Sequence, residues 1–318
     1  MAIFGALIRT ARPAQWLKNL ALFAPLVFTG WLFAPTAFWL VVRAALVFTI
    51  LSSTTYFFND WLDVKADQQH PIKKFRPIAS GELPLPLALF VLVVGVIGGL
   101  TWAYMINYYL FLCGLVYLVV QVFYSTILKQ IPIVDVIVIA FGYLLRVYAG
   151  AFTISAHMDV WFLLTVISVS LFLAVGKRRG EMTLLAGQAT PQATQAGGRG
   201  QTRATLKRYT EPLLDIYTGM FSTATWITYA LFTFNHPKIV PDGRALSLIS
   251  ILPKTLISEK WMMITIPLVV YGIMRYLQLI YEKNEGESPE KILLSDKPLM
   301  ITVMIWMIAV VGIIYYVA

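Results

Sequence analysis

Long apolar runs alternate with short polar connections along the whole chain. Nine of these runs approach or reach the roughly 20 predominantly apolar residues that a helix needs to cross a bilayer. Several contain Gly or Pro, which transmembrane helices tolerate better than soluble helices do. The predicted spans are approximately Trp16–Phe33, Ala37–Asn59, Leu83–Tyr104, Tyr108–Leu128, Ile133–Thr153, Val160–Gly176, Ile216–Phe234, Trp261–Tyr281 and Leu299–Val317. The pattern predicts an all-α, polytopic membrane protein with about nine transmembrane helices, forming a single transmembrane domain over residues 1–318.

The composition supports a membrane protein and argues against a soluble one. Hydrophobic residues make up 58% of the chain and charged residues only 13%, and the mean hydropathy is +0.73. A soluble globular protein is about half apolar and about a quarter charged. The single cysteine, Cys113, lies inside a predicted span, so no disulfide framework is expected.

Basic residues are concentrated in alternate connections. They lie at the N-terminus and after the second, fourth, sixth and eighth predicted spans, whereas the other side has four basic residues in one long loop. By the positive-inside rule the N-terminus is cytoplasmic. The main predicted cytoplasmic loops cover about 60–82, 177–215 and 282–298. The net charge of +9 is thus explained by topology and by contact with anionic lipid, and no nucleic-acid partner is expected.

The stretch NDWLDVKADQQHPIKKFRPIAS, Asn59–Ser80, gathers acidic residues at the end of the second span. Asp60, Asp63 and Asp67 are spaced i, i+3, i+7, which puts them at roughly 0°, 300° and 340° around a helix. Asn59 borders the same stripe. Carboxylate and amide oxygens close together suit Mg²⁺, which typically keeps waters and bridges to substrate phosphates. The spacing therefore predicts a magnesium site formed by these four residues.

Basic residues follow the aspartates directly. Lys73, Lys74 and Arg76 can contact phosphate oxygens, and the Arg side chain can do so in a bidentate manner. Pro71 and Pro77 stop the helix and shape the loop. The aspartates and the basic residues together predict a Mg²⁺–diphosphate site at the cytoplasmic surface. A charge run is more often a solvated loop, but three acids and an amide on one stripe at the end of a span favour the site.

The same residues resemble a known family. The pattern N-D-x-x-D-x-x-x-D, from Asn59 to Asp67, resembles the first aspartate-rich motif of the UbiA superfamily of intramembrane prenyltransferases, and nine helices with cytoplasmic loops after the even spans fit that superfamily. Two further stretches are similar to its decaprenyl-phosphate phosphoribosyltransferase branch. They are HPIKKFRPIASG, His70–Gly81, and RPAQWLKNLALFAPL, Arg12–Leu26.

A second charged cluster, GKRRGE at Gly176–Glu181, closes the sixth predicted span. Aromatic prenyltransferases of the superfamily have a second aspartate-rich motif in this region. Here the residues are Lys177, Arg178 and Arg179 with the single acid Glu181, which favours direct phosphate contacts over a second metal. The alternative is a positively charged anchor at the cytoplasmic end of a helix, which is common.

The remaining candidates rest on weaker patterns. Tyr124 and Lys129, at the end of the fourth span, resemble the superfamily pattern. Tyr209 matches a family tyrosine, and a plain interfacial aromatic is an equal alternative. Asp135 and Arg146 lie inside the fifth span, where ionisable groups are usually functional or paired. For these two we favour structural ion pairs with neighbouring helices.

The resemblance implies an enzyme, a membrane-embedded phosphoribosyltransferase. It would use Mg²⁺ to transfer 5-phosphoribosyl from phosphoribosyl pyrophosphate to a polyprenyl phosphate such as decaprenyl phosphate. Diphosphate would be released, and the product would serve cell-envelope glycan (arabinan) synthesis. The implied location is the inner (plasma) membrane, with the site facing the cytoplasm, and Asp60, Asp63 and Asp67 would be catalytic. Implied substrate contacts are Lys18, Asn19, Lys73, Lys74, Arg76, Tyr124, Lys129, Lys177, Arg178, Arg179, Glu181 and Tyr209.

Two other functions stay open at this point. An aromatic polyprenyltransferase of the same superfamily, of the quinone or haem O type, would use the same aspartates for a prenyl diphosphate, but the basic GKRRGE argues against it. A membrane transporter could use Asp135 and Arg146 along its pathway, but the charged motifs gather at one membrane face. The polyprenyl length and the oligomeric state, homo-oligomers included, are left open.

Replacing Asp63 with Asn should abolish Mg²⁺-dependent turnover with little loss of folded protein. The substitution removes a metal-binding charge at a position predicted to lie on a polar surface. Turnover and the yield of monodisperse protein from detergent would be measured together. Normal Mg²⁺-dependent turnover in this variant would exclude the metal role.

Overall fold

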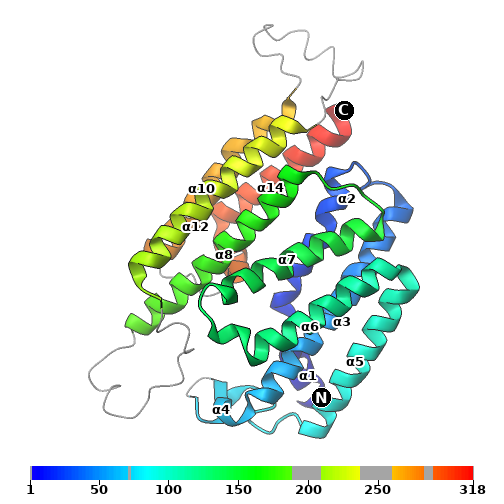
Figure 1. Ribbon diagram of the computed structural model, residues 1–318, viewed down its shortest axis with the longest axis vertical. Coiled ribbons are helices and arrows are strands. Elements are labelled where there is room, and N and C mark those ends of the chain that lie inside the picture. Colours follow the sequence, from blue (N-terminus) through cyan, green and yellow to red (C-terminus); the bar gives the residue numbers. More distant parts are fainter. Residues whose placement is uncertain (1, 71–72, 188–208, 237–259, 283–288, 318) are drawn as a thin grey trace, which may run out of the picture. The chain divides into compact units, whose positions relative to one another are not determined.

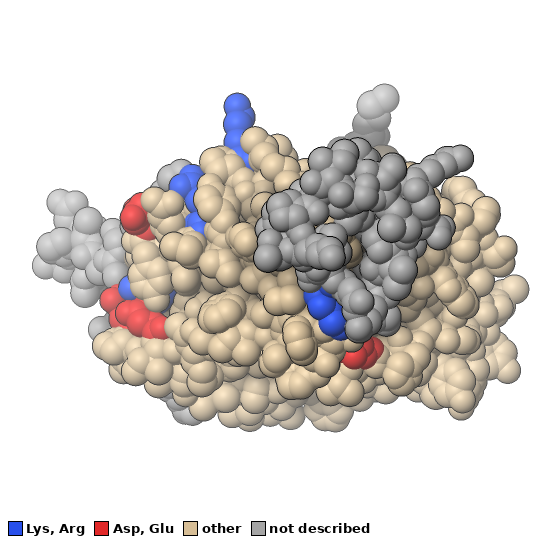
Figure 2. All heavy atoms as spheres, turned by 90° about the horizontal axis from the view of Figure 1, so that it is seen from above, with Lys and Arg blue, Asp and Glu red and all other residues tan. Residues whose placement is uncertain are grey.

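The chain is helical throughout the part that a computed structural model describes, which comprises residues 2–70, 73–187, 209–236, 260–282 and 289–317 (Figure 1). Within these ranges seven helical segments are long and apolar enough to cross a membrane. Most of the surface seen in Figure 2 is uncharged. These findings confirm an all-α, multi-pass membrane protein. Residues 188–208, in the second predicted cytoplasmic loop, lie outside the described residues.

The chain forms two compact units. The first comprises Met1–Leu26, Leu32–Ala156 and Met182–Thr210, and the second comprises Val27–Trp31, His157–Glu181 and Glu211–Ala318. Elements of the first unit are α1 (Ala2–Ala11), the 3₁₀ helix η1 (Pro13–Phe23), α3 (Pro35–Leu62), α4 (Val64–Gln68), η2 (Lys73–Phe75), α5 (Leu85–Ile106), α6 (Tyr108–Thr126), η3 (Leu128–Gln130) and α7 (Val134–Thr153). The short helix α2 (Ala24–Phe28) spans the boundary between the units.

The second unit also consists of helices. They are α8 (Val160–Gly187), α10 (Glu211–Asn235), η6 (Trp261–Thr265), α12 (Ile266–Glu282), α13 (Pro289–Ser295), α14 (Lys297–Gly312) and the π-helical η7 (Ile313–Val317). Asp296 caps α14, because its carboxylate accepts a hydrogen bond from the amide of Leu299 at 2.9 Å and also contacts Arg275 at 2.7 Å. Arg275 is thus held by an ion pair.

Two of the nine predicted spans are not among the seven segments that are long and apolar enough to cross a membrane. The span predicted at Trp16–Phe33 is a 3₁₀ helix followed by α2, because Pro13 and Pro25 restrict this stretch and Pro25 has no amide hydrogen to donate. The helix α10 covers the predicted span Ile216–Phe234 and has 25 residues, but it is more polar than the seven. Its buried polar residues are Thr218, Ser222, Thr225, Tyr229 and Thr233.

Helix α3 is the centre of the first unit. It packs against α1, η1, α5, α6 and α7, and it buries Val41, Phe48 and Leu51 in the main apolar core. A close approach of α7 to η1 depends on Gly150, because a Cβ atom there would lie 2.1 Å from the carbonyl oxygen of Leu22. Gly150 therefore lets α7 pack directly against the backbone of η1.

A polar network lies inside the same core. Arg146 of α7 is 6% exposed. Its Nε donates to Asn19 at 2.9 Å, its Nη1 to the Gly142 carbonyl at 2.8 Å and its Nη2 to the Tyr117 hydroxyl at 3.1 Å. Among the described residues its partners are neutral, so these contacts support the structural role favoured above, but without an ion pair. The Asn19 amide also donates to Thr49 at 3.0 Å, which favours a structural role for Asn19 over head-group binding.

Replacing Gly150 with Ala should destabilise the protein. The added methyl group would meet backbone, which cannot rotate away, and overpacking of this kind costs about 1–3 kcal/mol. Gly98 on α5 is the matched control, because a Cβ atom there would meet nothing within 4 Å. Thermal unfolding midpoints in detergent should fall for Gly150→Ala and stay the same or rise slightly for Gly98→Ala. Equal midpoints would contradict the close contact between α7 and η1.

Candidate functional site

The predicted acidic motif lies where α3 ends. Asn59 and Asp60 occupy the last turn of α3, Asp63 caps it, and Asp67 lies in α4. The helical hydrogen bonding continues across the junction, because the amide of Asp63 donates to the Asn59 carbonyl at 3.0 Å and the amide of Asp67 donates to the Asp63 carbonyl at 2.8 Å. The break after Leu62 therefore leaves all four residues close in space, in a nearly continuous helical path.

Two arginines bind the buried aspartates. Arg12 Nη2 lies 2.6 Å from Asp60 Oδ1, and Arg76 Nη1 lies 3.1 Å from the same oxygen and 2.7 Å from Asp67 Oδ2. Asp60 and Asp67 are only 2% and 3% exposed. The Arg12 guanidinium also lies over the ring of Tyr56, 4.7 Å from its centroid. These contacts join residues from α1's end, α3, α4 and the loop after η2 into one charged cluster.

Lys129 and Asp63 form a second, more exposed pair. Lys129 Nζ lies 3.3 Å and 3.4 Å from the two carboxylate oxygens of Asp63, and about a third of the Asp63 side chain is exposed. Both residues were candidates from the sequence, and the fold brings them together across 66 residues. Beside them, the half-buried Asn59 side chain makes no hydrogen bond within the described part of the chain.

The donor set suits a hard divalent cation. All its members are oxygen donors, and one nitrogen of Arg76 contacts both Asp60 and Asp67, so these two carboxylates converge on a single positive charge. Among the described residues, no group of three His, Cys, Asp or Glu side chains is close enough to hold a metal ion. The carboxylates bind arginine and lysine instead, and a metal would have to share or replace those partners.

The basic loop after the aspartates is folded around His70. The amide of Lys73 donates to His70 Nδ1 at 3.3 Å. Partial burial, followed by the charge of Lys73, lowers the pKa of His70 from its ordinary value. The ring is therefore neutral at neutral pH, and the positive charge of the loop comes from Lys73, Lys74 and Arg76. Lys74 is exposed, with its ammonium 5.1 Å from the Phe75 ring centroid.

Tyr209 lies in the first unit, away from solvent. Its hydroxyl donates to Asp135 Oδ1 at 2.9 Å and accepts the amide hydrogen of Ile133 at 2.6 Å. Asp135 is 0% exposed and Tyr209 is 3% exposed. The contact between Asp135 and Tyr209 was not foreseen, because nothing in the local sequence links residues 74 positions apart.

The predicted cluster GKRRGE belongs to α8 in the second unit. Arg178 is 0% exposed and its Nη1 contacts Glu181 at 2.5 Å. Arg179 Nε contacts Asp215 at 2.8 Å, and the guanidinium lies 5.4 Å from the Tyr281 ring centroid. The two arginines thus pair with carboxylates of their own unit. Three further candidates, Lys18 in η1, Tyr124 in α6 and Lys177 in α8, are half-buried.

Arg12 is a site residue that the sequence suggested only indirectly. It falls within the family-like stretch Arg12–Leu26, but its basic charge was attributed to topology. It lies between α1 and η1 with a left-handed backbone, φ 53° and ψ 68°, which turns the chain between the two helices. Its pairing with Asp60 depends on two segments 48 residues apart.

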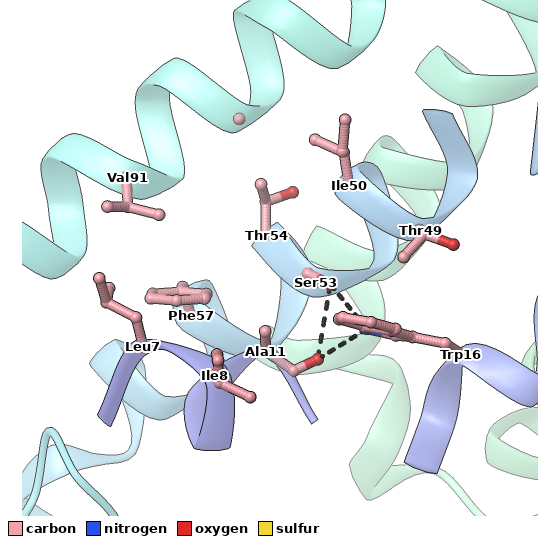
Figure 3. Close-up of a pocket in the computed structure, with 11 residues that line it drawn as sticks. Leu7, Ile8, Ala11, Trp16, Thr49, Ile50, Ser53, Thr54, Phe57 and Val91 are labelled. Carbon is pink, nitrogen blue, oxygen red and sulfur yellow. Dashed lines mark hydrogen bonds between the residues drawn. The ribbon is translucent and has the colours of Figure 1, made fainter. Parts of the chain in front are cut away.

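A carbon-lined hollow of about 340 Å³ lies beside the cluster, between α1, α3 and α5 (Figure 3). Its polar side chains are satisfied within the protein. Trp16 Nε1 and Ser53 Oγ both donate to the Ala11 carbonyl, and Thr54 Oγ1 donates to the Leu51 carbonyl. On α3, Ser53 and Phe57 of the lining fall within about 60° of Asp60 around the helix. The hollow can take an apolar chain but offers no group for a phosphate.

Known proteins resemble this chain over nearly its full length. The model of the UbiA prenyltransferase family matches residues 20–177. Decaprenyl-phosphate phosphoribosyltransferase of Corynebacterium glutamicum is 31% identical, covering 97% of this chain and 86% of that protein. The enzyme of that name from Mycobacterium tuberculosis is 32% identical, covering 98% and 94%. A solved UbiA homolog from Archaeoglobus fulgidus bound to GPP and Mg²⁺ has the same fold, with a TM-score of 0.67, 19% identity and 97% and 99% coverage.

Replacing Asp60 with Asn should lower stability more than replacing Asp63 with Asn. The first change leaves Arg12 and Arg76 facing an uncharged, buried amide, which costs about 1–3 kcal/mol, whereas the exposed pair of Asp63 and Lys129 contributes about 0–1 kcal/mol. Thermal midpoints of the two variants in one detergent would be compared. Equal midpoints would show that the arginine contacts do not stabilise the fold.

Proposed function

The chain belongs to the UbiA prenyltransferase family, and on that basis we propose that it is a phosphoribosyltransferase. It transfers the 5-phosphoribosyl group of phosphoribosyl pyrophosphate to a polyprenyl phosphate, decaprenyl phosphate in the first instance, and releases diphosphate. The observation that supports this most is the full-length similarity to two decaprenyl-phosphate phosphoribosyltransferases. The charged cluster at the end of α3 supplies chemistry suited to such a donor.

The donor is small, soluble and strongly anionic, so it needs positive charge from the protein and from a metal. We place Mg²⁺ with the oxygen ligands Asn59 and Asp63. Asp60 and Asp67 join them where the metal shares or replaces Arg12 and Arg76 as their partners. When bound, Mg²⁺ neutralises the diphosphate and acts as a Lewis acid on the leaving group. The solved homolog bound to GPP and Mg²⁺ shares the fold, which supports a divalent cation in this family.

Basic residues of the first unit would bind the phosphates. Lys129 lies against Asp63, at the exposed side of the cluster, where it can contact a diphosphate without leaving its carboxylate partner. Arg76 offers a planar guanidinium suited to bidentate phosphate contacts. Lys73 and Lys74 are near it in the same loop. Lys177, Arg178 and Arg179 of the second unit stay proposed phosphate contacts on the basis of their charge.

The reaction breaks the bond between ribose C1 and a diphosphate oxygen, and forms a bond from C1 to an oxygen of the acceptor phosphate. Positive charge develops on the ribose, as in glycoside chemistry, and the electron pair of the broken bond leaves with the diphosphate. The acceptor phosphate is already ionised near neutral pH, so it needs positioning more than it needs a general base. The protein's main contribution is thus to hold two anionic groups close together.

The membrane setting fits these substrates. The protein is multi-pass, and an acceptor with a polyprenyl tail is dissolved in the bilayer. The basic connections favour a cytoplasmic N-terminus and a site facing the cytoplasm, where phosphoribosyl pyrophosphate is available. We therefore place the enzyme in the plasma membrane, with its product serving the synthesis of cell-envelope glycan.

Purified protein, given ribose-labelled phosphoribosyl pyrophosphate, polyprenyl phosphate and Mg²⁺, should transfer label to lipid-extractable product. The label moves because the ribose becomes attached to the polyprenyl phosphate. Lipid-phase radioactivity would be counted, and EDTA should reduce it to background because the diphosphate leaving group loses its metal.

Two results would contradict this proposal. An unlabelled lipid phase with protein that binds both substrates would exclude phosphoribosyl transfer. Product formed instead from a prenyl diphosphate and an aromatic acid would identify an aromatic prenyltransferase. Lys177, Arg178 and Arg179 would then serve only as a positively charged anchor at the cytoplasmic end of a helix. The matched control is Asp63→Asn protein in the same detergent, which should give background label with both substrate pairs.

A further inference from the structure

Tyr209 joins two segments that are far apart in the sequence. Its hydroxyl accepts the amide hydrogen of Ile133 at 2.6 Å and donates to Asp135 at 2.9 Å. All three belong to the first unit. A phenol that donates once and accepts once uses its full ordinary capacity, so replacing it with Phe would remove both bonds together.

The segment that Tyr209 contacts has an unusual backbone. Ile133, at the start of α7, has φ 69° and ψ −49°, a conformation that β-branched residues rarely adopt. Such backbones persist where the surrounding contacts hold them in place. Here the holding contacts include the hydrogen bond from the Ile133 amide to Tyr209 and the bond from the Val136 amide to the Ile133 carbonyl at 3.1 Å.

The same short connection contains Lys129. It runs from Ile127 to Ile133, between α6 and α7, and includes η3. Four residues before Ile133, the Lys129 ammonium contacts both carboxylate oxygens of Asp63. The connection is therefore fixed at one end by Tyr209 and at the other by Asp63. A change in the backbone at Ile133 would move Lys129 relative to the acidic motif.

We propose that Tyr209 and Asp135 are positioning residues. They fix the connection Ile127–Ile133, so that Lys129 stays beside Asp63 and meets the diphosphate of the donor. Asp135, fully buried, orients the phenol by accepting its hydrogen, which leaves the phenol oxygen free to accept from Ile133. The proposal rests on the proposed function only for the identity of the donor, because it requires a diphosphate ligand and no particular transfer reaction.

Tyr229 provides a matched control in the second unit. It is 4% exposed, close to the 3% of Tyr209. Its hydroxyl is hydrogen-bonded to Thr265 at 2.6 Å and to Trp306 at 2.8 Å. None of these residues is a candidate for phosphate or metal binding. Tyr229→Phe removes a buried, doubly bonded phenol oxygen and so reproduces the stability cost of Tyr209→Phe without the link to Lys129.

The test is a double-mutant cycle on binding of inorganic diphosphate in the presence of Mg²⁺, measured by calorimetry on the full chain. Tyr209→Phe should weaken binding by about fivefold to tenfold, which corresponds to the loss of a hydrogen-bonded restraint. Lys129→Met should weaken it at least as much. The double variant should bind no worse than Lys129→Met alone, because positioning Lys129 has no value once Lys129 is gone.

Tyr229→Phe should bind diphosphate as the unchanged protein does, with a fall in thermal midpoint similar to that of Tyr209→Phe. The proposal is overturned if Tyr209→Phe binds normally, if its effect adds fully to that of Lys129→Met, or if Tyr229→Phe weakens binding equally. Binding of inorganic diphosphate does not depend on the acceptor. Coupling in this cycle together with no label transfer would therefore overturn the proposed function and leave the positioning role supported.

Discussion

A buried carboxylate at the end of a membrane-spanning helix needs positive charge beside it, and Asp60 is such a carboxylate. Taking an ion out of water costs several kcal/mol unless a partner compensates. Arg12 and Arg76 are those partners, and Arg76 also serves Asp67. The arrangement ties the end of α1, the end of α3, α4 and the following loop together. The acidic motif is therefore part of the fold as well as a candidate site.

The structural role and the candidate metal-binding role fall on different aspartates. Asp60 and Asp67 are buried against arginine, whereas Asp63 is partly exposed and meets the flexible side chain of a lysine. Asn59 beside it makes no hydrogen bond within the described residues. A metal–diphosphate complex would approach most readily from the side of Asp63. The arginine-bound aspartates then act as the fixed base on which that exposed side is built.

Three arginines elsewhere in the described chain also have partners within the protein. Arg146, deep in the first unit, has neutral partners that offer it oxygen atoms and aromatic faces. Arg178 and Arg179 in the second unit each meet a carboxylate. A buried guanidinium can have neutral or charged partners, because its five N–H groups can donate to carbonyls, hydroxyls or carboxylates. Arg178 and Arg179 therefore have partners within the protein at positions whose sequence context indicates ligand binding.

The sequence by itself determined the membrane class, most of the spans and the acidic motif, because these depend on local properties. The length of an apolar run decides whether a helix can cross the bilayer, and i, i+3, i+7 spacing places side chains on one helix face. It also pointed to Lys129 and Tyr209 one at a time. It could not show that the stretch Pro13–Phe23 would be a 3₁₀ helix, that α3 would end at Leu62, or that α10 would bury hydroxyls. Only the tertiary structure decided which polar side chains meet, because those contacts depend on how the helices pack. Lys129 pairs with Asp63 and Tyr209 donates to Asp135, across 66 and 74 residues of sequence.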